Sequence, residues 1–171
     1  MFEYKPISMR AVPRALSKAE RYRLLNEPRQ AESICRDILH TDRENQKALA
    51  TLLLSLTDQF GAGLSVSVNH AREVLPRLKD EYERTYYEGV IFERWAKAQH
   101  REEVPGYVVY EWFLKAMSCY EQAQELAPSE NEDAVLRWNT CARILRRNSD
   151  IRPRPEDEAQ QADFHDEVPF R

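Results

Sequence analysis

Apolar residues recur every three or four positions from about residue 14 to residue 148, and strand-like alternation is almost absent. This spacing predicts amphipathic helices, each with one apolar side. Prolines and glycines divide the pattern, because proline cannot continue a helix and glycine favours turns. Pro76 should kink or end the helix that contains it. We expect seven helices, over residues 14–25, 28–39, 44–60, 65–78, 81–99, 106–127 and 131–147.

The predicted helices repeat one another. Ala31, Ala71 and Ala116 are each followed by larger or apolar residues four and seven positions later. Steps of 34 and 36 residues separate equivalent positions in the preceding helices, from Tyr22 to Leu56 and from Leu56 to Phe92. Such a period is typical of stacked helical hairpins, in which neighbouring units bury one another's apolar sides.

Two segments carry a resemblance to a known family. The sequence AMSCYEQAQELAP, at 116–128, resembles the second helix and following proline of a tetratricopeptide repeat. The segment 28–45, PRQAESICRDILHTDREN, is similar to the same part of the repeat. The resemblance covers residues 14–148, as three helical pairs and a closing helix, and is weakest in the second pair. It implies an all-α fold of antiparallel helical hairpins stacked as a short right-handed α-solenoid.

The two ends of the chain lie outside this pattern. Residues 1–13 contain two prolines and no apolar run, so we expect an irregular N-terminal arm. Residues 151–171 contain three prolines and six acidic residues, which predicts a flexible acidic tail over 149–171. No apolar stretch approaches the roughly 20 residues of a membrane-spanning helix, and no export signal is recognised. We therefore expect a cytoplasmic protein.

The charge of the chain limits the classes of partner that we expect. The formal net charge is −4, whereas dedicated nucleic-acid binders are usually basic. Six arginines nevertheless lie between residues 137 and 154, against one acidic residue. Three interpretations stay open: these arginines bind an acidic partner or nucleic acid, the acidic tail folds back onto them or onto the groove, or the region is simply solvated.

Nothing in the sequence favours catalysis. Only 4 of the 171 residues are glycine, which argues against glycine-rich phosphate loops. Cys35, Cys119 and Cys141 form no CxxC pair, and we expect all three to be buried, reduced and free of metal. The four histidines are scattered, without a metal-binding or catalytic spacing. We expect no enzymatic activity, no cofactor and no metal.

The resemblance implies that the first helix of each pair lines a concave groove. The residues expected there combine basic, apolar and aromatic groups that suit an extended acidic peptide. They are Arg23, Lys47, Leu54, Tyr86, Arg94, Asn139 and Arg143. We therefore predict a protein-interaction adaptor, monomeric or weakly dimeric, that binds a protein or peptide partner. The alternative is a nucleic-acid-associated helical repeat that uses the arginines of 137–154.

Overall fold

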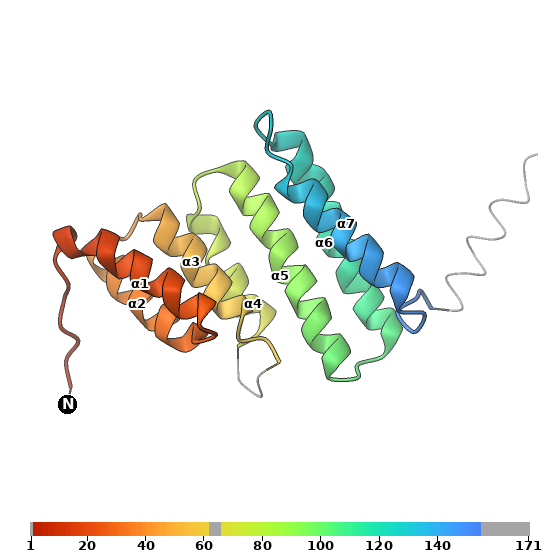
Figure 1. The fold of residues 1–171 in the computed structure, drawn as a ribbon, viewed down its shortest axis with the longest axis horizontal. Helices are drawn as coiled ribbons and strands as arrows, with labels where there is room; N and C mark the ends of the chain where they lie inside the picture. Colours follow the sequence, from red (N-terminus) through yellow and green to blue (C-terminus); the bar gives the residue numbers. More distant parts are fainter. Residues whose placement is uncertain (1, 62–65, 155–171) are drawn as a thin grey trace, which may run out of the picture.

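A computed structural model of the chain describes residues 2–61 and 66–154. These residues contain seven α-helices and no strand, so the all-α prediction is confirmed (Figure 1). Two 3₁₀ turns, Met9–Ala11 and Leu75–Arg77, accompany them. The helices are α1 (Val12–Leu24), α2 (Pro28–Thr41), α3 (Gln46–Thr57), α4 (Val68–Arg72), α5 (Glu81–Arg101), α6 (Gly106–Leu126) and α7 (Asp133–Arg147).

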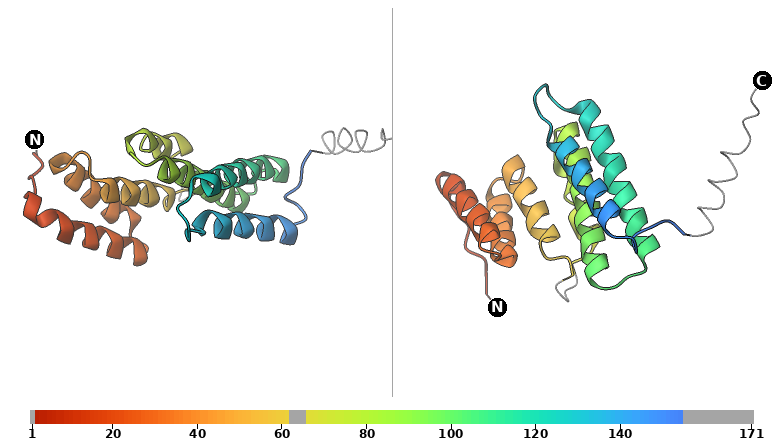
Figure 2. Two further views of the ribbon diagram at one scale, coloured as in Figure 1. Left: turned by 90° about the horizontal axis from the view of Figure 1, so that it is seen from above. Right: turned by 45° about the vertical axis from the view of Figure 1, so that its right-hand side comes forward.

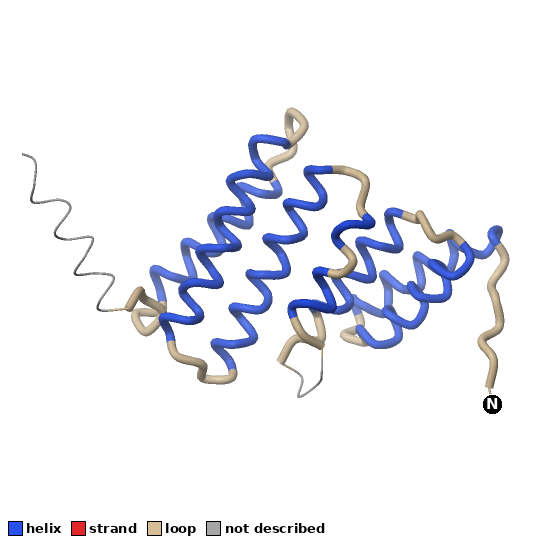
Figure 3. Tube along the Cα trace, turned by 180° about the vertical axis from the view of Figure 1, so that it is seen from behind, coloured by secondary structure: helices blue, strands red, loops and turns tan. Residues whose placement is uncertain are grey.

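The helices follow one another along the long axis of an elongated molecule (Figure 1). Successive helices pack together, and α3 also contacts α1 and α5. Helices α1, α3, α5 and α7 follow one another on the side turned to the viewer, and α2 lies behind α1, α4 behind α3 and α6 behind α7 (Figures 1 and 2). Figure 3 shows the same array from behind. We call the side formed by α1, α3, α5 and α7 the front face.

Capping side chains and a proline determine where three of the helices begin. Asn45 caps α3 by accepting a hydrogen bond from the backbone N–H of Ala48 (2.9 Å), which moves the start of this helix from the predicted 44 to Gln46. Asp80 caps α5 in the same way, accepting from Glu83 N–H at 2.8 Å. Pro28 occupies the first turn of α2, where the missing N–H costs nothing.

The fourth helix is the main departure from the predicted elements. Its predicted span, 65–78, contains only the short helix α4 and the 3₁₀ turn around Pro76. Because proline lacks an N–H and clashes with the preceding turn, the chain cannot continue as an α-helix through this position. Ser65, at the predicted start, lies outside the described residues.

Gly89 lies at a close contact between α5 and α6. The buried Tyr120 ring of α6 lies against Gly89 of α5, and a Cβ atom on Gly89 would come within 2.6 Å of the ring. The absence of a side chain on Gly89 therefore lets α5 and α6 approach closely. Ala31, Ala71 and Ala116 are also completely buried.

Residues 149–154 were predicted to belong to the flexible tail, but the structure shows that they pack against the helices. Ile151 is 3% exposed and belongs to the hydrophobic core. The carbonyl oxygen of Asp150 sits where a Cβ atom on Gly106 would be, only 1.8 Å from that position. The guanidinium of Arg154 lies 4.5 Å from the centre of the Tyr107 ring. An apolar residue and a stacked arginine thus hold this segment against the start of α6.

The rest of the predicted tail, residues 155–171, lies outside the described residues. Within residues 2–61 and 66–154, no helix combines the length and the apolar character needed to cross a membrane.

Candidate functional site

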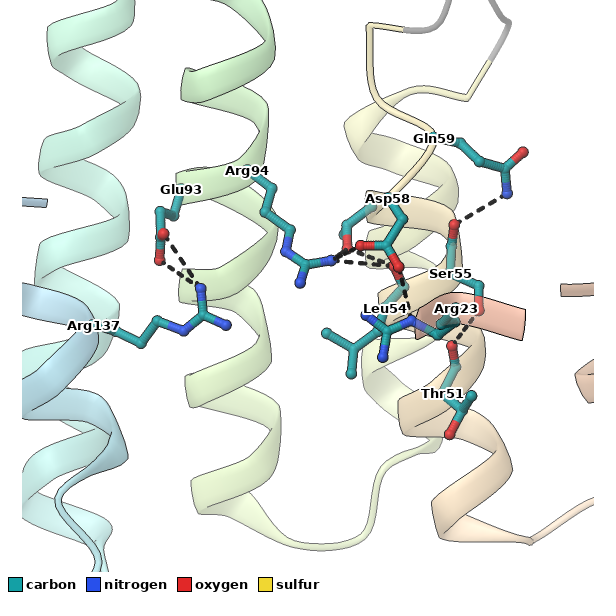
Figure 4. Close-up of polar contacts among 10 residues, drawn as sticks. Arg23, Thr51, Leu54, Ser55, Asp58, Gln59, Glu93, Arg94 and Arg137 are labelled. Atoms are coloured by element: carbon teal, nitrogen blue, oxygen red, sulfur yellow. Dashed lines mark hydrogen bonds and ion pairs between the residues drawn. The ribbon is translucent and has the colours of Figure 1, made fainter. Parts of the chain in front are cut away.

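Two arginines converge on one carboxylate at the centre of the front face. Asp58 directly follows α3, and Arg23 of α1 donates from Nε to its Oδ2 at 2.7 Å. Arg94 of α5 donates to the other oxygen of the same carboxylate, to Thr57 Oγ1 (2.7 Å) and to the Leu54 carbonyl (3.3 Å). The three charged side chains are between 21% and 24% exposed. The cluster therefore connects α1, α3 and α5 while remaining in contact with solvent (Figure 4).

A second carboxylate lies next to the first cluster. Glu93 of α5 is completely buried and accepts a hydrogen bond of 2.6 Å from the Tyr120 hydroxyl of α6. Lys97, one turn further along α5, also donates to it. From α7, Arg137 places Nη1 at 3.3 Å from both carboxylate oxygens (Figure 4). Glu93 therefore joins α5, α6 and α7.

The neighbours of Glu93 determine whether its carboxyl group is ionised. Burial by itself raises the pKa of Glu93, but Lys97, the Tyr120 hydrogen bond and Arg137 together outweigh burial and hold the pKa below its usual range. Burial also raises the pKa of Tyr120, and the negative Glu93 raises it further. Glu93 is therefore a carboxylate and Tyr120 a neutral donor at physiological pH.

The two clusters leave an excess of positive charge. Together they hold four cations against two carboxylates, and we call them the charged row: Arg23, Asp58, Glu93, Arg94, Lys97 and Arg137. Burial lowers the pKa of Arg94 more than Asp58 raises it, and the nearby Arg23 and Arg137 lower it further. The row would therefore favour one or two additional carboxylates from outside.

Half-buried tyrosines adjoin the charged row on α5. The rings of Tyr82 and Tyr86 stack with centroids 5.6 Å apart, and Tyr87 meets Tyr86 edge-on at 5.3 Å. Burial lowers the pKa of Arg137, but Glu93 and, to a lesser degree, Tyr86 outweigh burial and hold this pKa above its usual range. Aromatic rings beside arginines are common anchors in protein interfaces.

Five of the seven predicted binding residues lie on the front face or beside it. Arg23, Leu54 and Arg94 meet around Asp58, and Tyr86 lies near Arg137. Lys47 is exposed, and it lies seven residues before Leu54, which places it on the same side of α3 about two turns away. Arg23 and Arg94 are therefore brought together by a carboxylate of the chain itself.

Asn139 and Arg143 lie elsewhere. They follow Arg137 by two and six residues, which places them about 160° and about 120° round the helix from the side of α7 that faces α5. Arg143 is exposed and Asn139 is half-buried. The structure does not bring these two residues into the charged row.

Asp58, the shared partner of Arg23 and Arg94, was not predicted from the sequence, and neither was the pair of Glu93 and Arg137. A signal was present, because Asp58 and Arg94 are 36 residues apart, the same step that relates Leu56 to Phe92. Opposite charges at equivalent repeat positions would have indicated a pair between neighbouring helices.

The arginines of 137–154 are not all available to a partner. Arg137 is committed to Glu93, and Arg154 to Tyr107 and, at 3.8 Å, Glu111. Arg143, Arg146, Arg147 and Arg152 are exposed.

The three cysteines have little thiolate character. Burial raises the pKa of the Cys35, Cys119 and Cys141 thiols to about 12, so they are poor nucleophiles. Cys35 and Cys141 are buried as expected, whereas Cys119 is only half-buried. In residues 2–61 and 66–154, no three His, Cys, Asp or Glu side chains are grouped to hold a metal ion, and no buried side-chain polar atom lacks a hydrogen bond.

Comparisons with known proteins add no relative. No family model, no curated protein and no solved structure matches this chain.

Proposed function

We propose that this protein is a non-enzymatic interaction module that binds an acidic segment of a partner protein across the front face. The observation that carries the proposal is the charged row, in which four cations face two carboxylates beside half-buried tyrosines. An acidic side chain of the partner would balance the excess charge, and an apolar or aromatic side chain would pack on Leu54 or the tyrosines.

The proposed architecture is that of a short right-handed α-solenoid resembling tetratricopeptide repeats. In it, α1–α2, α3–α4 and α5–α6 are three helical hairpins and α7 closes the stack. The packing of successive helices and the contacts of α3 with α1 and α5 support this arrangement. A stack of this kind presents its first helices as one continuous surface, which suits an extended partner.

A peptide selection tests the proposed function. A random peptide library is displayed and selected against the full chain, and the affinity of each enriched peptide is measured by fluorescence anisotropy. We expect enrichment of sequences that combine Asp or Glu with an aromatic or large aliphatic residue. Enrichment of basic sequences, or of none, contradicts the proposal.

Charge reversal then locates the site. Arg94 and Arg23 are unsuitable because they hold Asp58, so the test uses Lys47→Glu with Arg101→Glu. Both residues are exposed, and Arg101 is seven residues beyond Arg94 on the same side of α5. The matched control is Arg29→Glu with Arg43→Glu, two exposed positions at the ends of α2 or just beyond it. We expect about ten-fold weaker binding for the face variant, as for the loss of two partly exposed charge pairs, and little change for the control.

A further inference from the structure

A second surface lies on the outward side of α1. Arg14, Lys18, Arg21 and Leu25 follow one another at helical spacing and are all exposed. None of the three basic residues forms an ion pair with any residue that the structure describes. The one acidic residue of α1, Glu20, lies well round the helix from Lys18, because two residues turn an α-helix by about 200°. We call Arg14, Lys18 and Arg21 the basic stripe.

The basic stripe and two apolar residues line one hollow on the surface of α1. The hollow has a volume of about 540 Å³, and Tyr22 and Leu25 line it together with Ser17 and the stripe. Leu25 is 62% exposed, and Leu24 beside it is 88% exposed. Two leucines exposed beside three cations suit a ligand that carries both carboxylates and a large apolar side chain.

This surface is separate from the front face. Arg23, the α1 residue of the charged row, comes nine residues after Arg14, which is about two and a half helical turns. Arg23 therefore points to the opposite side of α1, where it binds Asp58. A ligand on the basic stripe would leave the front face free.

The chain itself contains a segment with the complementary chemistry. Residues 155–171 carry six acidic side chains and one basic side chain, Arg171. Three large apolar residues, Phe164, Val168 and Phe170, are interspersed among the acidic ones. The segment therefore combines the carboxylates that the stripe lacks with side chains that could enter the hollow.

Position favours a second copy as the source of this segment. Residue 154, after which it begins, packs on Tyr107 at the start of α6. Helix α1 lies at the other end of the array (Figure 1). To reach its own α1, the segment would have to pass along the whole molecule, whereas a neighbouring copy has no such constraint.

We propose that residues 155–171 of one copy dock on the basic stripe and hollow of α1 of a second copy. The contact joins two different surfaces, so it leaves a free stripe at one end and a free acidic segment at the other, and it extends into chains as concentration rises. Its charges are exposed, and added salt therefore weakens it. The proposal does not depend on the function of the front face.

Sedimentation velocity of the full chain over a concentration series, at low and high salt, tests the proposal with two variants. The stripe variant is Arg14→Glu, Lys18→Glu, Arg21→Glu. The tail variant replaces the six acidic residues with their amides: Glu156→Gln, Asp157→Asn, Glu158→Gln, Asp163→Asn, Asp166→Asn, Glu167→Gln. A charge-matched control reverses exposed residues elsewhere: Arg29→Glu, Arg43→Glu, Arg143→Glu.

We expect the wild type and the control to associate at low salt, and each variant alone to associate about ten-fold more weakly. Mixing the two variants should restore a dimer, because the stripe variant supplies an intact acidic segment and the tail variant an intact stripe. Circular dichroism melts check that both variants fold. A wild type that stays monomeric at low salt overturns the proposal, as do variants that associate alone as strongly as the wild type or a mixture that forms no dimer.

Discussion

Glu93 is a carboxylate without solvent contact, and donors from α5, α6 and α7 keep it ionised. Removing one partner of such a group is costly, because the remaining charges lose their compensation in a poorly solvated place. This residue should therefore contribute more to stability than any exposed ion pair of the chain.

Replacing Glu93 with Gln should lower the free energy of unfolding at pH 7 by about 3 kcal/mol. The folded pKa of Glu93 lies below its unfolded value of about 4.3, so the stabilisation is present above that pH and is lost as pH falls through the folded pKa. Urea unfolding of wild type and variant from pH 7 to pH 3 measures this. A difference that stays constant down to pH 3 would contradict the assignment.

Asp58 separates two guanidinium groups, and Asp58→Asn leaves them facing each other. We expect a loss of about 1–2 kcal/mol, because the three side chains are mostly buried but still in contact with solvent. Glu44→Gln is the matched control, since Glu44 pairs with Lys79 where both side chains are mainly exposed, and such pairs contribute about 0–1 kcal/mol. Equal effects of the two substitutions in urea unfolding would show that the Asp58 cluster is not structural.

Residue types were easier to predict from the sequence than their partners. Arg23 and Arg94 were recognised as residues of the front face, but as contacts for an external partner. Their shared contact with Asp58 depends on which sides of three helices meet, and the apolar periodicity of one helix does not contain that information. Glu93 looked like an ordinary polar position of α5 because its partners come from two other helices.

At the scale of elements, the interface of α5 and α6 depends on Gly89. In a solvent-exposed helix, replacing glycine with alanine is stabilising by about 1 kcal/mol. Gly89→Ala should instead be destabilising, by about 1–3 kcal/mol, because the added Cβ atom meets the Tyr120 ring at 2.6 Å. Thermal unfolding of the variant measures the sign, and a raised Tm would mean that the two helices can separate without cost.

Helix positions were largely predictable, because periodicity, caps and prolines act within a few residues. The start of α5 at Glu81 and the helix α7 illustrate this, as each has a clear apolar side or cap. The break at Pro76 was predicted, but the early end of α4 at Arg72 was not. The packing of 149–154 was missed as well, because a single buried residue, Ile151, holds a segment whose composition is polar.

In the whole molecule, the charged row and the basic stripe each carry an excess of cations, although the net charge of the chain is −4. Positive charge gathered on two surfaces favours acidic partners and steers their approach, whereas the overall charge opposes non-specific binding to nucleic acid. We therefore expect an interaction module whose ligands are acidic segments.

Hydrogen–deuterium exchange of the full chain, with and without a saturating acidic peptide selected against it, shows which helices the peptide covers. If the peptide binds the front face, amide exchange should slow in the second half of α3 and in α5, with little change in α2. Slowing confined to α2, α4 and α6, or no slowing at saturation, would contradict the proposed binding face.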